Sequence, residues 1–201
     1  MQVDSAPARE AALVAGPPTG AGASGLTFDE VYDANVDYVW RIVARLGVRP
    51  PAVEDVAQDV FVVVHKKLGE FEGRSSIRTW LFQIARRVVH DHRRTLQRKD
   101  PRAADDPDVD RVPTDERDAP DATAARAQAI RILQELLDRL DDEKKEVFIL
   151  AELEQLPAPQ IAEALGINVN TVYSRLRLAR EAFNAALARH RAREQRDGAR
   201  R

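Results

Sequence analysis

The stretch PQIAEALGINVNTVYSRLRLAREAFNAAL, residues 159–187, carries the strongest fold signal in the chain. Apolar residues at helical spacing predict a short helix around Ile161, and Gly166 then supplies a turn. Asn168 stands where an N-cap side chain would start a longer helix from about Val169. A short helix, a glycine turn and a longer helix follow one another in a helix-turn-helix unit.

Polar and apolar residues separate onto two faces of the longer helix. The inward face is apolar and consists of Val172, Leu176, Ala179, Phe183 and Leu187. The outward face carries amide, hydroxyl and guanidinium groups, from Asn170, Thr171, Tyr173, Ser174, Arg175, Arg177 and Arg180. Such a helix fits the major groove of DNA, where its first residues meet base edges and its arginines meet phosphates or guanine. The competing interpretation is a helical hairpin with a solvated arginine face.

Three amphipathic helices are predicted upstream, within residues 26–99. The first stops at Gly47, and the second covers residues 53–68. The third begins after a serine N-cap, at Ser75 or Ser76. Apolar residues recur at three- and four-residue spacing on all three helices, which predicts one shared core and a first helical domain.

Composition divides the rest of the chain. Residues 1–25 are rich in alanine, proline and glycine, which predicts a disordered tail. Residues 100–125 are acidic, contain several prolines and lose helical periodicity, which predicts a flexible linker. The second domain covers residues 126–190 with the helix-turn-helix, and residues 191–201 are a basic tail. The predicted fold is therefore all-α, with two small helical domains joined by a flexible acidic linker.

The composition excludes several classes of function. The chain has 201 residues, a formal net charge of -2 and no cysteine, so disulfides and cysteine-dependent metal sites or catalysis are excluded. We find no P-loop, G-x-G-x-x-G or H-E-x-x-H motif, and we expect neither enzymatic activity nor a cofactor. His90 and His92 project about 200° apart on a helix and cannot share a metal ion. Without a signal peptide or an apolar span, a cytoplasmic protein with no membrane insertion is expected.

The third helix and its preceding loop have a basic outward face. The residues that we assign to nucleic-acid contact there are Arg74, Ser75, Ser76, Thr79, Trp80, Arg86, Arg87, His90, Arg93 and Arg94. Basic charge along one helix face suits a nucleic-acid backbone, and a neighbouring aromatic ring can support an unstacked base. Core packing is the competing interpretation for Trp80, which also stands at the edge of the apolar face.

The second helix presents a different outward face, made by Asp55, Gln58, Asp59 and Val62. Carboxylates repel phosphate, so we expect this face not to contact DNA. An exposed valine among carboxylates and an amide is typical of a protein docking site, and it is equally compatible with an ordinary solvated face. These residues alone do not choose between the two.

Three stretches, in this order, resemble the extracytoplasmic-function (ECF) group of the sigma-70 family of RNA polymerase sigma factors. They are VEDVAQDVF at residues 53–61, RSSIRTWLFQIAR at residues 74–86, and QIAEALGINVNTVYSRL at residues 160–176. The resemblance covers about residues 28–187. It implies a protein that binds core RNA polymerase and directs initiation at specific promoters, by recognising two promoter elements and melting the upstream edge of the bubble.

The resemblance also implies a partner for each surface. The outward face of the second helix would dock on the clamp helices of the largest polymerase subunit. The third helix and its loop would recognise and melt the minus-ten element, and the helix-turn-helix would read the minus-thirty-five element of promoter DNA. An anti-sigma factor is implied as a further partner. Arg87, Asn170 and Tyr173 replace a common Asn, Gly and Lys of the family, and these departures bear on promoter preference.

Two other functions stay open from the residues alone. A stand-alone helix-turn-helix regulator would bind a palindromic operator as a dimer, without polymerase. A helical adaptor would bind only proteins, through the face that contains Asp55. The sigma-factor interpretation carries a condition: the arginines of both helices must face outward, neither turned into the interior nor neutralised by neighbouring acids.

Overall fold

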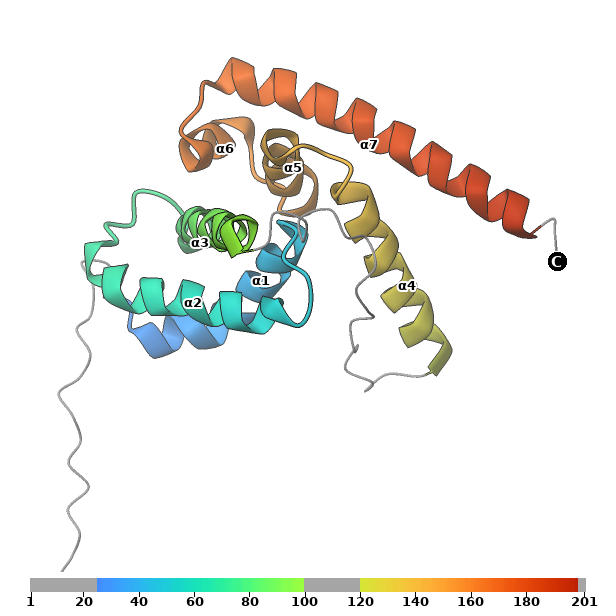
Figure 1. Ribbon diagram of the computed structural model, residues 1–201. Helices are drawn as coiled ribbons and strands as arrows, with labels where there is room; N and C mark the ends of the chain where they lie inside the picture. The colour runs from blue at the N-terminus through green and yellow to red at the C-terminus, as the bar shows by residue number, and fades with distance from the viewer. Residues whose placement is uncertain (1–24, 100–119, 199–201) are drawn as a thin grey trace, which may run out of the picture.

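A computed structural model describes residues 25–99 and 120–198, and within these ranges every regular element is a helix (Figure 1). The all-α prediction is confirmed for them. Residues 1–24 of the predicted N-terminal tail and residues 100–119 of the predicted linker lie outside the described residues. Within those ranges, no helix combines the length and the apolar character needed to cross a lipid bilayer.

The first three helices are α1 (Phe28–Arg45), α2 (Ala52–Lys67) and α3 (Ile77–Lys99). Each contacts the other two, and each contributes fully buried side chains to one core, among them Ile42, Val60 and Leu81. The predicted three-helix core is confirmed.

Local hydrogen bonds explain where α1 and α3 begin. The Thr27 hydroxyl accepts from the Glu30 N–H while the Glu30 carboxylate accepts from the Thr27 N–H, which is a capping box. Before α3, the Ser76 hydroxyl accepts from the Thr79 N–H at 3.1 Å. Ser76 is therefore the serine that caps α3.

The remaining helices are α4 (Pro120–Leu137), α5 (Asp142–Phe148), α6 (Ala158–Leu165) and α7 (Val169–Gly198). α4 begins inside the stretch predicted as linker, and α7 continues through most of the residues predicted as a basic tail. Helix therefore extends further at both ends of this domain than the sequence pattern indicated.

A π-helical turn, Ile149–Leu153, follows α5 directly. The Glu154 N–H donates to the Ile149 carbonyl, one residue further back than in an α-helix. Two carboxylates, one in this turn and one directly after it, pair with different helices. Glu152 pairs with Arg180 on α7, and Glu154 pairs with Arg45 on α1.

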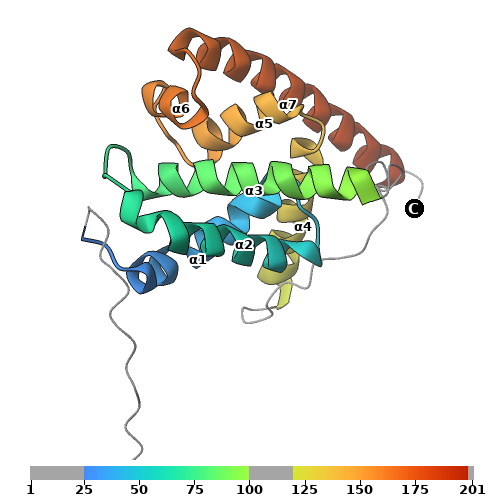
Figure 2. The ribbon, with the colours of Figure 1, turned by 60° about the vertical axis from the view of Figure 1, so that its left-hand side comes forward.

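The two groups of helices lie against each other. Figure 2 shows α3 between the α1–α2 hairpin and the α5–α6 pair. α3 contacts α6, α1 contacts α4, and the buried apolar residues form one continuous cluster. The sequence analysis did not predict this contact, because it treated the two domains as separate modules.

Candidate functional site

The helix-turn-helix consists of α6 and α7, and its turn has the chemistry that the sequence predicts. Gly166 ends α6 with a φ of +66°, in the left-handed region that glycine adopts without strain. Asn168 Oδ1 accepts from the Asn170 N–H at 2.8 Å and starts α7. Val172 and Ala179 are fully buried, so α7 faces the core as predicted.

The outward face of α7 is largely open to solvent. Its exposed members are Asn170, Tyr173, Ser174, Arg177 and Arg180, while Thr171 and Arg175 are half-buried. Tyr173 is 59% exposed, which is unusual for a large aromatic side chain in a helix of a folded domain. All seven residues lie on the first three turns of α7, as a major-groove contact requires.

Each arginine of this face pairs with an acid of the same domain. Arg177 lies 2.7 Å from Glu181, Arg180 lies 2.6 Å from Glu152, and Arg175 lies 2.7 Å from Glu143. The Arg177 and Arg180 side chains are more than half exposed, so these are surface ion pairs of small net energy. A DNA phosphate or base can replace such a partner at little cost.

On α3 and its loop, the structure divides the predicted contact residues into three classes. Arg74, Ser76, Arg87 and Arg94 are exposed; Ser75, Trp80, Arg86, His90 and Arg93 are half-buried; and Thr79 is buried. The prediction that Thr79 faces outward is therefore wrong. Thr79 is 1% exposed, and its hydroxyl bonds the Ser76 hydroxyl at 2.8 Å.

The surroundings of Trp80 are compatible with both interpretations that the sequence left open, core packing and base contact. Its ring is half-buried and packs on Phe71, with the ring centroids 5.2 Å apart. The loop that carries Arg74 connects these two aromatic residues. A ring that is fixed on one side and accessible on the other suits stacking against a base.

Acids of α5 bind the central basic side chains of α3. Arg86 Nε donates to Glu146 Oε1 at 2.7 Å, and His90 Nε2 lies 3.0 Å from the same oxygen. Arg93 Nη1 donates to Asp142 Oδ1 at 2.7 Å. The expectation that the arginines stay free of neighbouring acids is therefore wrong for these side chains, as it is for those of α7.

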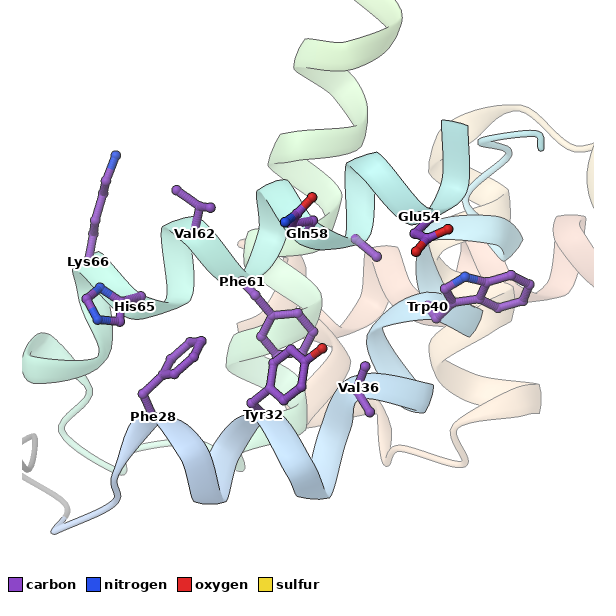
Figure 3. Close-up of a pocket in the computed structure, with 11 residues that line it drawn as sticks. Phe28, Tyr32, Val36, Trp40, Glu54, Gln58, Phe61, Val62, His65 and Lys66 are labelled. Atoms are coloured by element: carbon purple, nitrogen blue, oxygen red, sulfur yellow. The ribbon is translucent and has the colours of Figure 1, made fainter. Parts of the chain in front are cut away.

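The acidic face of α2 is exposed as predicted. Asp55, Gln58, Asp59 and Val62 all face solvent, and Val62 is 47% exposed. Beside them, a groove of about 600 Å³ runs between α1 and α2 (Figure 3). Phe28, Tyr32 and Phe61 meet inside it, and the Tyr32 and Phe61 rings lie 4.7 Å apart. Trp40 forms the other end of the groove and is 40% exposed.

Comparison with known proteins bears on both helical domains. Residues 31–99 match the family "Sigma-70 region 2", and residues 130–183 match "Sigma-70, region 4". The RNA polymerase sigma factor YlaC of Bacillus subtilis is 30% identical over an alignment that covers 76% of this chain and 85% of YlaC. This chain belongs to the sigma-70 family.

One further relative places the chain within the family, and one solved structure shows the same fold. The ECF RNA polymerase sigma factor SigC of Mycobacterium tuberculosis is 30% identical, over 83% of this chain and 86% of SigC, so the protein is an ECF sigma factor. The sigma factor RpoE of Bartonella quintana, solved in complex with the anti-sigma factor NepR, has a similar fold. Its TM-score is 0.65 at 19% identity, over 80% of this chain and 96% of RpoE.

The sequence analysis missed two features of this sigma factor. The first is the groove, although Phe28, Tyr32, Val36 and Trp40 recur every four residues and could have shown a second apolar stripe on α1. The second is the acidic contact from α5 to α3. Glu146 stands directly before Val147 and Phe148 in the sequence, with no local signal of its partners.

Proposed function

We propose that this sigma factor docks on core RNA polymerase through α2 and the adjoining groove, and presents α3 to the minus-ten element and α7 to the minus-thirty-five element. The observation that carries the proposal is that acidic and basic side chains lie on different helices. Acidic and apolar groups gather on α2, whereas the arginine-rich faces belong to α3 and α7. The protein acts in the cytoplasm and performs no catalysis itself.

The docking surface combines an apolar centre with charged edges. Trp40, Tyr32 and Val62 offer exposed apolar area, and Asp55 and Asp59 flank it. Aromatic anchors inside a polar rim are typical of protein interfaces in which a few side chains provide most of the binding energy. A basic helix with apolar side chains is the partner that this surface fits best.

α3 and its loop are proposed to hold the melted minus-ten strand. Trp80 supplies a stacking surface, Arg74 lies on the connecting loop, and Arg87 and Arg94 are exposed along the helix. Unstacking a base costs a few kcal/mol, which stacking and backbone contacts offset without ATP hydrolysis.

α7 is proposed to read the minus-thirty-five element through its first turns. Two modest DNA contacts on one promoter reinforce each other when polymerase holds both in position. Neither domain then needs to bind duplex DNA tightly alone. This feature separates the proposed function from a stand-alone regulator, which would bind its operator without polymerase.

An anti-sigma factor is proposed as a further partner. The Bartonella quintana sigma factor was crystallised with one, and its fold is similar. The exposed groove and the acidic face of α2 are the surfaces of this chain best suited to a second protein. We therefore expect an anti-sigma factor to compete with polymerase for them.

The test is reconstitution with cognate core RNA polymerase. The chain should co-purify with core enzyme, and sequencing of the DNA retained by the holoenzyme should give a two-element promoter that supports run-off transcription. A gel shift with the chain alone should show weak duplex binding. Strong operator binding without polymerase, and no initiation with it, would favour the stand-alone regulator.

Charge reversal tests the docking face. Asp55→Lys or Asp59→Lys should weaken core binding about tenfold, because each replaces an exposed carboxylate of the docking surface with a cation. Glu135→Lys makes the same charge change on exposed α4 and should leave core affinity unchanged. Equal core affinities of all three variants would remove α2 from the docking surface.

A further inference from the structure

We infer that Asn170 and Tyr173 set the base preference of α7: Asn170 reads an adenine, and Tyr173 contacts the methyl group of a thymine in a neighbouring base pair. The inference rests on the proposed function, because it takes α7 as the helix that enters the major groove at the minus-thirty-five element. That function leaves open which bases these two residues meet. The hydrogen-bonding groups and the apolar surface that their side chains leave unused decide it.

Both side chains lie at the end of α7 that would meet base edges. Asn170 and Tyr173 belong to the first two turns of α7, which Figure 1 shows as the outermost helix of its domain, and both are exposed. The N-terminal residues of a recognition helix are those that contact bases. Three residues apart, the two lie on the same side of the helix, about 4.5 Å from each other along its axis. Stacked bases follow one another about every 3.4 Å, so the two side chains reach neighbouring base pairs.

The side-chain amide of Asn170 is available to a base. Its backbone N–H already donates to Asn168 Oδ1 at 2.8 Å, which holds this turn in place. The amide itself is exposed and makes no hydrogen bond to any residue in the two described ranges. It offers a donor beside an acceptor, and adenine presents the matching N7 acceptor and N6 donor in the major groove. Guanine presents two acceptors there, so the amide selects adenine.

The ring of Tyr173 is an unused apolar surface. At 59% exposed, it is the most exposed large apolar side chain in the described part of the molecule. Neither its ring nor its hydroxyl has a partner among the residues that the structure describes. The methyl group of thymine is the apolar group that base edges present in the major groove. Burial of this methyl group against the ring removes apolar surface from water, and no other base supplies such a contact.

The neighbouring side chains of α7 do not compete for these two bases. The Ser174 hydroxyl donates to the Thr171 carbonyl at 3.0 Å, so it offers DNA only lone pairs. Arg177 offers only donors, which suit guanine, and it lies about 10.5 Å beyond Asn170 along the helix axis. That distance corresponds to about three base-pair steps. The element should therefore carry adenine, thymine and guanine contacts in the order of the helix, with the guanine farthest from the adenine.

The experiment changes single chemical groups on the DNA and uses the full-length chain in reconstituted holoenzyme. Selection from a duplex pool that is randomised across the minus-thirty-five region gives the element preferred by the wild-type holoenzyme. Uracil then replaces one thymine at a time, which removes only the methyl group. An adenine analogue with C–H in place of N7 replaces one adenine at a time, which removes only that acceptor. Both analogues keep Watson–Crick pairing, and fluorescence anisotropy measures the Kd of each duplex.

We expect uracil at one position to raise the wild-type Kd about fourfold, the effect of one buried methyl group. Tyr173→Ala should lose this dependence and Tyr173→Phe should keep it, because the ring and not the hydroxyl makes the contact. The adenine analogue should raise the wild-type Kd about tenfold at one position, as expected for the loss of half of a bidentate contact. Asn170→Ala should lose that second dependence.

Asn184→Ala is the matched control for Asn170→Ala. Asn184 is also exposed on α7, about 21 Å beyond Asn170 along the helix axis, and its replacement should leave both dependences intact. Asn168 is present in every variant, so the cap at the start of α7 is kept. The wild-type measurements with modified bases need no substitution in the protein, so they test the inference even if a variant does not fold.

Three results would overturn the inference and leave the proposed function intact. The first is a wild-type holoenzyme whose Kd is unchanged by every thymine and adenine replacement. The second is a dependence that persists in Tyr173→Ala or in Asn170→Ala. The third is a Tyr173→Phe variant that loses affinity for all duplexes equally, since that result assigns the hydroxyl to a phosphate. A holoenzyme that selects no element in this region would contradict the proposed function instead, and this inference with it.

Discussion

Arg177 offers the sharpest test of promoter reading by α7, because the structure gives both its present partner and its exposure to solvent. Its side chain is 66% exposed and pairs with Glu181, four residues along the same helix, at 2.7 Å. Exposed pairs at this spacing contribute about 0.3–0.5 kcal/mol. A bidentate arginine–guanine contact contributes about 1–3 kcal/mol of base discrimination.

Replacement of the surface pair by a base contact is therefore favourable, and Arg177→Ala should remove about 0.5–2.5 kcal/mol of promoter affinity. At 1.4 kcal/mol for each tenfold, the loss is about 2- to 60-fold in Kd. The free energy of unfolding should change by less than about 0.5 kcal/mol, because the side chain contributes no core packing. Glu181→Gln, which releases Arg177 from its surface partner, should strengthen binding about twofold.

The assay is fluorescence anisotropy of the reconstituted holoenzyme with a labelled duplex that contains the selected minus-thirty-five element. A base contact predicts that Arg177→Ala loses discrimination at one base pair of the element, whereas a phosphate contact lowers affinity for all sequences and reduces the salt slope by about 1. A loss of less than twofold, with unchanged preference at every position, would refute the assignment of Arg177 to DNA.

Two further predictions concern the helix-turn-helix core and the domain contact. Ile161→Ala should lower the free energy of unfolding by about 2–5 kcal/mol, because Ile161 is 1% exposed and its truncation leaves a cavity in the core. Urea denaturation measures this, and Gln160→Ala on the exposed face of α6 is the control. Burial opposes the charge of Asp142, but the hydrogen bond and charge of Arg93 outweigh it and lower the pKa of this carboxyl. The lowered pKa of Asp142 predicts that its contribution to stability is complete above its ordinary pKa of 3.8 and is lost as pH falls through the folded value. The difference in unfolding free energy between wild type and Asp142→Asn should therefore shrink between pH 6 and pH 3, and a difference that grows on acidification would contradict the Arg93 contact.

Local signals explain how much of the fold could be predicted. Gly166 and Asn168 fix the turn of the helix-turn-helix, one by its backbone conformation and the other by its side-chain hydrogen bond. Helical spacing alone predicts that Val172 is buried and that Tyr173 is exposed. The same periodicity misplaced Thr79, which is 1% exposed, because a helical wheel describes one helix and leaves out the elements that pack against it, such as α6 against α3. Periodicity alone therefore does not decide which side chains are buried.

The contact between the domains could not be predicted in the same way. Arg86 and Glu146 are 60 residues apart, and the sequence around each residue does not indicate that they are partners. An arginine face that is suited to phosphate is equally suited to carboxylate, so composition cannot say which partner is present. The condition that the arginines stay free of acids was therefore too strict. The comparisons show an ECF sigma factor although its arginines pair with acids in the structure of the chain alone.

Site-specific photocrosslinking in the promoter-bound holoenzyme measures directly which surface of the sigma factor meets which partner. A photoreactive phenylalanine analogue would replace Val62 on α2, Trp80 on α3 or Tyr173 on α7, all at least partly accessible. We expect crosslinks from position 62 to the largest polymerase subunit, from position 80 to the melted strand, and from position 173 to the upstream duplex. Crosslinks from position 62 to DNA, or from position 173 to polymerase alone, would contradict this expectation.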